Sequence, residues 1–241
     1  MATPVRLAAL LVCAGLALFT VSCSALIGSG HIVTESRTVS DFGEVSLAGA
    51  GEVVLAQGDK EGLTITADDN IMPHIRTRVS NGKLTVDFDV MGGIRPSKPI
   101  KFDLTVTTIR AMHLSGGWKV QAERIKADRL ALEASGSAEV KLDGLEATDL
   151  ITELSGSGRF SFAGQATTQK VDISGSGNYA AGNLSSQKAK VRISGSGNAT
   201  VWARECLDVS ISGAGAVGYY GSPKITQSIS GSGALKALGN K

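Results

Sequence analysis

The sequence contains little proline, few aromatic residues and almost no excess of charge of either sign. Its 241 residues include 5 prolines, and aromatic residues make up only 5% of the chain. A hydrophobic content of 42% is too high for a disordered chain, and the shortage of helix-boundary residues disfavours a helical bundle. The net charge of +2 comes without any basic tract interleaved with aromatics, so we expect no nucleic-acid partner.

Cysteine is also scarce, with three in the chain. Cys13 lies in the first hydrophobic run and Cys23 follows it, which leaves Cys206 alone in the mature protein without an intramolecular disulfide. Because no histidine lies near it in sequence, we interpret Cys206 as a small core residue rather than a catalytic thiol.

One hydrophobic run stands out, LAALLVCAGLALF at residues 7–19, preceded by Arg6. A basic residue, a short apolar stretch and small residues predict a secretory signal peptide over 1–23, and the run is shorter than the roughly 20 residues of a membrane span. The run ends in TVSC, which resembles a bacterial lipobox with Cys23 as the lipidated residue, although Thr20 stands where leucine is usual. Ordinary cleavage near Ser24 or Ala25 is the alternative. Since Ser24 is not the aspartate that retains lipoproteins in the inner membrane, a lipidated chain is expected at the outer membrane.

Short Ser-Gly elements recur along the second half of the chain at steps of 18 to 20 residues. Each begins at a small serine, as follows: Ser115, Ser135, Ser155, Ser174, Ser194, Ser212 and Ser230. An earlier relative, AGAG at Ala48, stands outside this even series.

The residues before each element alternate between apolar and polar. Leu114, Leu154, Ile173 and Ile193 directly precede it, and Val171 and Val191 lie two residues earlier. This period of two predicts half-buried strands.

A single unit of about 19 residues cannot bury its own apolar face, but stacked units place equivalent positions about 4.8 Å apart. We therefore predict an all-β fold, a parallel β-helix with one repeat per coil. Right-handed winding is favoured, because parallel crossover connections are almost always right-handed. A β-sandwich is the alternative, although nothing in that fold requires turns at near-constant spacing.

The glycines of the repeated elements are predicted to form the corners of the coils, because a tight corner needs a positive φ or a close backbone approach. The corner glycines are Gly136, Gly156, Gly158, Gly175, Gly177, Gly195, Gly197, Gly213, Gly215, Gly231 and Gly233.

The first part of the mature chain is less regular. Residues 24–40 are interpreted as a linker followed by an early strand, and residues 41–238 as the β-helical domain. Strands are expected at EVVLAQGD, GLTITAD, GKLTVDFDV and IKFDLTVT, where the coils begin with longer excursions. The stretch DDNIMPHI predicts a short helix or loop, with Asp69 or Asn70 as its cap.

One formal nucleotide-binding motif, GxGxxG, spans Gly213 to Gly218. Such a site needs a following helix and an acidic residue about 20 positions later. YYGSPKITQ follows instead, and no acidic residue occurs after Asp208, so we expect no nucleotide cofactor.

Metal and acid–base sites are also disfavoured, and we expect no cofactor and no enzymatic activity. His31, His74 and His113 are scattered, Asp68-Asp69-Asn70 fits a solvated turn better than a calcium loop, and Asp87 and Asp89 fit an ordinary outward strand face. Two polar positions remain of interest. Asn178 and Asn198 are equivalent in successive coils and predict a polar ladder, and Tyr220 is a candidate surface contact if Tyr219 faces inward.

The chain resembles the bacterial family described as putative autotransporter adhesins with a head GIN domain. The resemblance rests on VSLAGAGEVVLAQGD at 45–59, LTITADDNIMPHIRTRVSNGKLTVDF at 63–88, RPSKPIKFDLTV at 95–106 and the coils from 115 onward. It covers about 42–237 and implies a secreted or cell-envelope β-helical protein, often a lipoprotein. It carries no catalytic residues over to this sequence.

Three functions follow from these observations. The favoured one is a cell-envelope adhesin or interaction module, held to the membrane by a lipid on Cys23, that binds a protein or glycan through its exposed faces. The second is a periplasmic structural or envelope-stress partner. The third, a carbohydrate-active enzyme, lacks a cluster of acidic or basic side chains in one groove.

Overall fold

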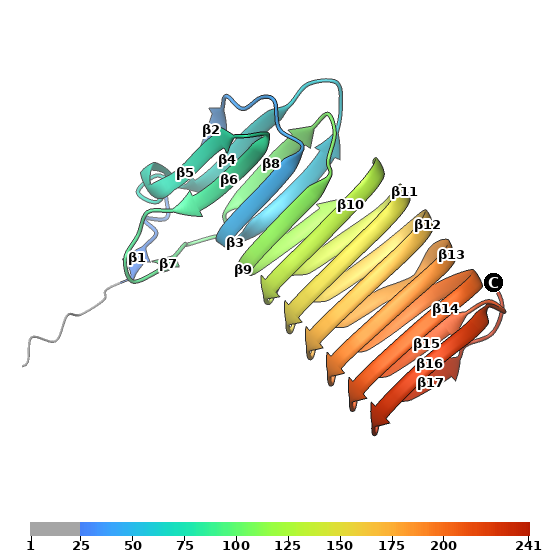
Figure 1. The fold of residues 1–241 in the computed structure, drawn as a ribbon. Helices are drawn as coiled ribbons and strands as arrows, with labels where there is room; N and C mark the ends of the chain where they lie inside the picture. Colours follow the sequence, from blue (N-terminus) through green and yellow to red (C-terminus); the bar gives the residue numbers. More distant parts are fainter. Residues whose placement is uncertain (1–24) are drawn as a thin grey trace, which may run out of the picture.

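The computed structural model describes residues 25–241, which form a stack of parallel coils preceded by a group of shorter strands (Figure 1). The stack contains these strands: β9 (Ala111–Ala122), β10 (Ile125–Gly136), β11 (Glu139–Gly156), β12 (Arg159–Gly175), β13 (Asn178–Gly195), β14 (Asn198–Gly213), β15 (Ala216–Tyr220), β16 (Lys224–Gly231) and β17 (Ala234–Ala237). Each pairs in parallel with the equivalent strand of the next coil, so that Ile173, Ile193 and Ile211 stand in one register column. The prediction of an all-β parallel β-helix is confirmed.

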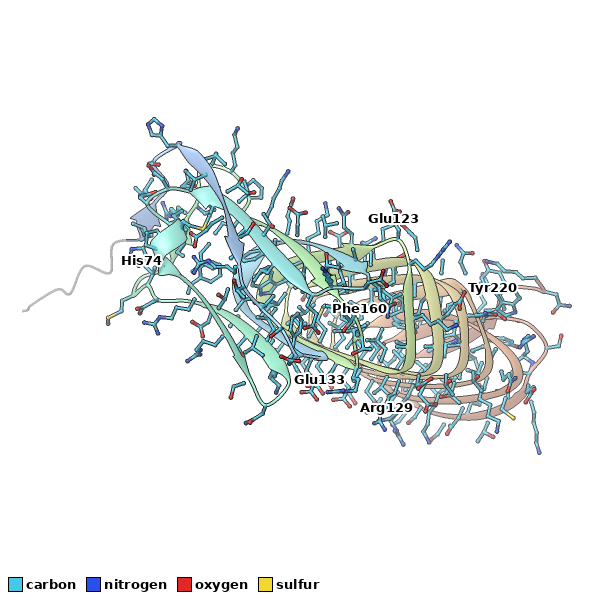
Figure 2. The ribbon with its side chains drawn as sticks, turned by 90° about the horizontal axis from the view of Figure 1, so that it is seen from above. His74, Glu123, Arg129, Glu133, Phe160 and Tyr220 are labelled. Atoms are coloured by element: carbon cyan, nitrogen blue, oxygen red, sulfur yellow. The ribbon has the colours of Figure 1, made fainter. Side chains whose placement is uncertain are left out.

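The core runs through the middle of the stack and is built by the alternation that the sequence shows. Val171, Ile173 and Phe160 are buried, whereas Asp172 between the first two faces outward. Figure 2 shows Phe160 inside the coils and Arg129 outside them. Burying each such aliphatic side chain stabilises the fold by roughly 1.5–3 kcal/mol before ordering entropy is subtracted.

Each repeated Ser-Gly element ends one strand and starts the next one after a bend. Gly175 has φ +123°, and a Cβ at this position would lie 2.7 Å from the carbonyl oxygen of Gly156 in the preceding coil. Gly158 has no positive φ, but a Cβ there would lie 2.6 Å from the carbonyl oxygen of Ala138. The other first glycines share the positive φ. Three of the other second glycines lie similarly close to a carbonyl oxygen of the preceding coil, whereas a Cβ on Gly177 would meet the Leu154 side chain. The other first glycines are Gly136, Gly156, Gly195, Gly213 and Gly231, and the other second glycines are Gly177, Gly197, Gly215 and Gly233.

The N-terminal part is a group of short strands around β3. It comprises β1 (Leu26–Ile27), β2 (Ile32–Arg37), β3 (Glu44–Gln57), β4 (Gly62–Asp68), η1 (Met72–His74), β5 (Ile75–Ser80), β6 (Lys83–Phe88), β7 (Ile94–Arg95) and β8 (Lys101–Val106). β3 pairs in parallel with β9 and so joins this part to the stack, whereas β2–β4, β4–β8 and β5–β6 are antiparallel.

Two details of this part differ from the sequence interpretation or add to it. The 3₁₀ turn η1 has Ile71 at its N-cap and no side-chain cap, so the prediction of Asp69 or Asn70 as a cap was wrong. The interval 24–40 contains β1 and β2, and β2 is hydrogen-bonded to β4. Residues 1–23, including Cys23, lie outside the described residues.

Candidate functional site

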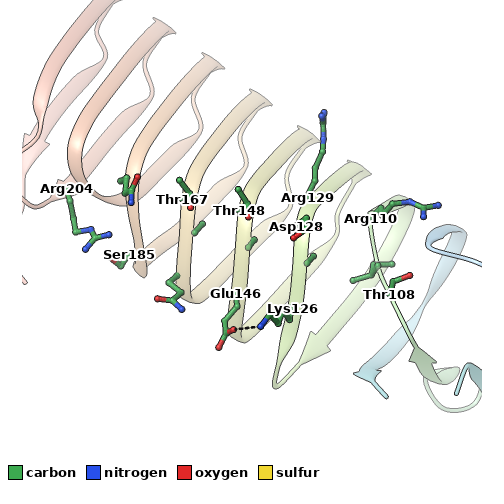
Figure 3. Close-up of a pocket in the computed structure, with 16 residues that line it drawn as sticks. Thr108, Arg110, Lys126, Asp128, Arg129, Glu146, Thr148, Thr167, Ser185 and Arg204 are labelled. Carbon is green, nitrogen blue, oxygen red and sulfur yellow. Dashed lines mark ion pairs between the residues drawn. The ribbon is translucent and has the colours of Figure 1, made fainter. Parts of the chain in front are cut away.

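A groove runs along the outside of the stack where each coil bends between two straight segments. At this bend the parallel ladder omits one residue per coil: pairing passes from Ala127 to Arg129 in β10 and from Ala147 to Asp149 in β11. Asp128 and its equivalents therefore project at a kink rather than in a regular strand. Figure 3 shows Asp128, Thr148 and Thr167 following one another along this line.

Small side chains form the floor of the groove and polar ones its walls. The alanines at the bend, Ala127, Ala147 and Ala166, keep the floor low. The groove has a volume of about 770 Å³. Its walls bear Thr108, Arg110, Lys126, Asp128, Arg129, Glu146, Thr148, Gln165, Thr167, Ser185, Gln187 and Arg204.

Opposite charges meet within the groove at one place. Lys126 Nζ lies 3.8 Å from Glu146 Oε2 across two neighbouring coils, the ion pair drawn in Figure 3. Arg110, Arg129 and Arg204 also line the groove, and no carboxylate of residues 25–241 lies within ion-pair distance of them. The Arg110 guanidinium lies against Gly43, so Arg129 and Arg204 supply the guanidinium groups that remain available to a ligand.

A second hollow, of about 460 Å³, lies beside the groove, and cationic and threonine side chains line it as well. Thr168 and Lys188 in this hollow directly follow Thr167 and Gln187 of the groove in sequence. Its four lysines are Lys170, Lys188, Lys190 and Lys224.

Cys206 lies in this hollow, in register between Lys188 and Lys224. Its side chain is exposed, so the interpretation of Cys206 as a core residue was wrong. The alternation that buries Leu207 and Val209 turns Cys206 outward.

A buried polar network supports the coils beneath these hollows. Tyr179 donates a hydrogen bond of 3.0 Å to Gln169 Oε1, and Gln169 Nε2 donates one of 2.7 Å to Ser186 Oγ. Ser186 in turn donates to the carbonyl oxygen of Trp202 at 2.7 Å. Burial raises the pKa of the Tyr179 phenol above its usual range. Because such groups are costly to bury unpaired, this network holds three successive coils in one arrangement.

The histidines and acidic pairs singled out in the sequence occupy separate places. His113 Nδ1 lies 2.8 Å from Glu133 Oε2, and His74 Nδ1 lies 3.1 Å from the carbonyl oxygen of Asp89. Asp87 pairs with Arg78 at 2.8 Å, and Asp89 pairs with Arg76. Within residues 25–241, no group of three or more His, Cys, Asp or Glu side chains is arranged to hold a metal ion.

The Asp68-Asp69-Asn70 segment ties the N-terminal strands together. Asp68 is fully buried, so describing it as part of a solvated turn was wrong. Its carboxylate accepts hydrogen bonds from Ser97 Oγ and from the amides of Ser97 and Gly30. The Ser97 hydroxyl, aided by these amides, lowers the pKa of the Asp68 carboxyl despite its desolvation. Asn70 donates to the carbonyl oxygen of Ile27 at 2.8 Å, so this segment has a structural role.

The remaining sequence candidates lie on or between strands. Gly213 ends β14 and Ala216 starts β15, so a strand follows the formal nucleotide motif where a helix would be needed. Asn178 and Asn198 are register partners, as the ladder prediction required. The Tyr220 ring is covered by Lys241, whose Nζ lies 4.4 Å from the ring centroid and donates to the carbonyl oxygen of Gly182.

Sequence reasoning missed the groove itself. Its residue types differ from coil to coil, so no repeated motif marks them. The available signal was the break in alternation, since Ala127-Asp128-Arg129 and Ala147-Thr148-Asp149 interrupt the inward–outward pattern at equivalent positions.

Comparisons with known proteins place this geometry among related folds. The family model described as "Putative auto-transporter adhesin, head GIN domain" matches residues 41–223. A crystal structure of a "putative adhesin" from Bacteroides fragilis is 26% identical, with a TM-score of 0.84 over 89% of this chain and 100% of that one.

Two structures of lower identity share the fold alone. A "putative lipid binding protein" from Parabacteroides distasonis is 22% identical, with a TM-score of 0.73, and covers 89% of this chain and 100% of its own. A "putative adhesin" from Parabacteroides merdae is 21% identical, with a TM-score of 0.70, and covers 89% of this chain and 99% of its own. No curated protein matches the chain.

Proposed function

The chain belongs to the family described as "Putative auto-transporter adhesin, head GIN domain", and from this premise we propose that it is a non-enzymatic cell-envelope protein that binds an extended polymer in its polar groove. The family description supports an envelope or surface role. Among residues 25–241, no helix has the length and apolar character that crossing a membrane requires.

The length of the groove is the observation that carries this proposal. Its lining comes from the segment before β9 and from β10, β11, β12, β13 and β14 in succession. At about 4.8 Å per coil, these segments extend the groove to roughly 24 Å along the stack. A compact small molecule would occupy a fraction of that length, whereas a polymer laid along the axis contacts every coil.

The walls support binding through hydrogen bonds. Hydroxyl and amide groups of Thr148, Thr167, Gln165 and Ser185 stand along the groove, and each can donate and accept. The parallel ladder on both sides holds the backbone of these residues at fixed spacing. The entropy cost of ordering the groove when a ligand binds is therefore small.

We further propose that Cys23 carries a lipid that anchors the domain at the outer membrane. The TVSC sequence that precedes the domain supports this anchor. A lipid with a single site of attachment leaves the groove, more than 80 residues further along the chain, free to reach a ligand.

The proposal includes no catalysis, because the groove has only two carboxylates and no histidine or cysteine in its lining. Glu146 is paired with Lys126, and Asp128 has no catalytic partner among the lining residues. In the described part of the chain, the two groups with shifted pKa values also have structural explanations. Asp68 fastens the N-terminal strands and Tyr179 belongs to the buried network.

The groove can be blocked without disturbing the core, because Thr148 and Thr167 are exposed. We expect purified protein to be retained on an immobilised panel of dextran, polygalacturonate and chondroitin, and the T148W/T167W double variant to lose that retention. Gln121→Trp, which places the same ring on an exposed strand position outside the groove, should bind as the parent does. Equal retention of all three proteins, or of none, would contradict groove binding.

The envelope location is tested separately by protease treatment of intact and permeabilised cells. Cleavage of the 41–238 domain in intact cells supports an adhesin facing outward. Protection until permeabilisation would support the periplasmic alternative instead.

A further inference from the structure

The lining of the groove and of the hollow beside it carries a local surplus of positive charge. Eight cationic and three anionic side chains line the two, a surplus of five positive charges. The whole chain has a net charge of only +2, so the residues outside this surface are net negative. The lining of the groove and hollow is therefore net positive, while the remainder of the chain is net negative.

Three of the eight cations are already paired. Lys126 pairs with Glu146, Lys170 with Asp172 at 3.0 Å, and Lys190 with Asp208 at 2.8 Å. The other five have no carboxylate within 4.0 Å among residues 25–241. These unpaired cations are Arg110, Arg129, Lys188, Arg204 and Lys224.

The ladder fixes the spacing of these charges. Arg129, Lys188 and Lys224 belong to one register column, which runs through Asp149, Thr168 and Cys206 between them. Three coil steps separate Arg129 from Lys188 and two separate Lys188 from Lys224, or about 14 Å and about 10 Å at the usual strand spacing. A single small anion reaches one of these cations, whereas a chain with repeated negative charges reaches all of them.

We propose that the polymer bound in the groove is a polyanionic glycan, one whose sugar residues carry carboxylate or sulfate groups. This inference rests on the proposed groove function and names its ligand class. Guanidinium groups form paired hydrogen bonds with such anions, and the groove threonines, serine and glutamines match sugar hydroxyls.

The lining also favours a glycan over a nucleic acid, the other common polyanion. Proteins that hold single-stranded nucleic acid supply aromatic rings on which bases stack. No aromatic side chain lines the groove or the hollow.

The test measures binding of the full mature chain to polygalacturonate and to its methyl ester, which has the same backbone without the charge. We expect the ester to bind at least about tenfold more weakly, because several ion pairs are lost. The double variant K188Q/K224Q should bind polygalacturonate at least about threefold more weakly than the parent and with a smaller dependence on salt. The matched control K101Q/K119Q removes two exposed lysines outside the lined surface and should bind as the parent does.

The outcomes separate this inference from the groove function on which it rests. Equal binding of polygalacturonate and its methyl ester, lost in T148W/T167W, would keep the groove and overturn the charge. If K188Q/K224Q and K101Q/K119Q lost the same affinity for polygalacturonate, the anionic groups would not bind at Lys188 and Lys224, and the assignment of these lysines would be overturned. Binding of a single-stranded oligonucleotide that exceeds glycan binding and needs Lys188 and Lys224 would replace the glycan with a nucleic acid. No binding of any polymer would overturn the groove function as well.

Discussion

Replacing Gly175 by alanine should destabilise the protein by about 2 kcal/mol, and the structure separates the sources of this loss. Gly175 has φ +123°, where an L side chain costs about 1–2 kcal/mol. The new Cβ would lie 2.7 Å from Gly156 O, the oxygen that accepts a 3.0 Å hydrogen bond from Ser176 N. Displacing that oxygen weakens a bond worth about 0.5–1.5 kcal/mol, and a loss of about 0.4–1 kcal/mol in unfolded-state entropy offsets part of the total.

Two other glycines provide matched controls. Gly93 has φ +88°, but a Cβ added there would have no atom within 4 Å, so Gly93→Ala tests backbone strain alone. Gly62 has neither a positive φ nor a neighbour, so Gly62→Ala should be neutral or stabilise by up to about 1 kcal/mol. The expected order of stability is Gly62→Ala, then Gly93→Ala, then Gly175→Ala.

The assay is urea unfolding followed by far-ultraviolet circular dichroism and by the fluorescence of the two tryptophans, the buried Trp118 and the half-buried Trp202. A coil stack can unfold in stages, so coincidence of the two transitions must be shown before free energies are compared. If Gly175→Ala loses no more stability than Gly93→Ala, the close approach between corners does not contribute and the reasoning fails.

Individual contacts give three further predictions. Gln169→Leu should cost about 1–3 kcal/mol, because it removes the acceptor of the buried Tyr179 hydroxyl. Adding Tyr179→Phe should restore much of the urea midpoint, and a double variant no better than the single one contradicts this. Because the pKa of Asp68 is lowered in the folded protein, its stabilisation is present above its ordinary pKa of 3.8 and is lost as pH falls through the folded pKa. The difference in unfolding free energy between the parent and Asp68→Asn should therefore shrink in acid, and a difference that stays constant down to pH of about 2 contradicts this. Cys206 should react with a thiol reagent in the native protein, and reaction only after unfolding would place it in the core.

The fold could be predicted from sequence because repetition supplies information that a single strand lacks. Val171-Asp172-Ile173 is ambiguous alone, but the same pattern at Val191-Arg192-Ile193 fixes which side faces the core and which residues stack. The register near the corners then follows from the near-constant interval of 18 to 20 residues between the Ser-Gly elements, and bulges within the coils absorb the differences.

Cys206 shows where residue type was given more weight than position. Counting back by twos from Ile211 gives Val209 and Leu207 as inward residues, which leaves Cys206 outside. The alternation predicts an exposed Cys206, whereas the general preference of cysteine for buried positions predicts a buried one.

Asp68 was beyond sequence reasoning for a different reason, and the groove was marked in the sequence only by the break in alternation at the bend. The partners of Asp68 are Gly30 and Ser97, 38 and 29 residues away, and only the folded chain brings them together. The groove likewise depends on a bend at which the ladder omits a residue, a backbone feature without a residue motif of its own.

Under the proposed function, the positions at the bend would select the ligand, because these side chains do not have to repeat from coil to coil. The inward column keeps Leu154, Ile173 and Ile193 alike, since each must pack on the next. The groove column instead reads Lys126, Glu146, Gln165 and Ser185 in register, four different side chains in four coils. Under the proposed function, a substitution in this column would change what the groove binds at little cost to the core, and the same coil architecture could hold ligands with different charge patterns.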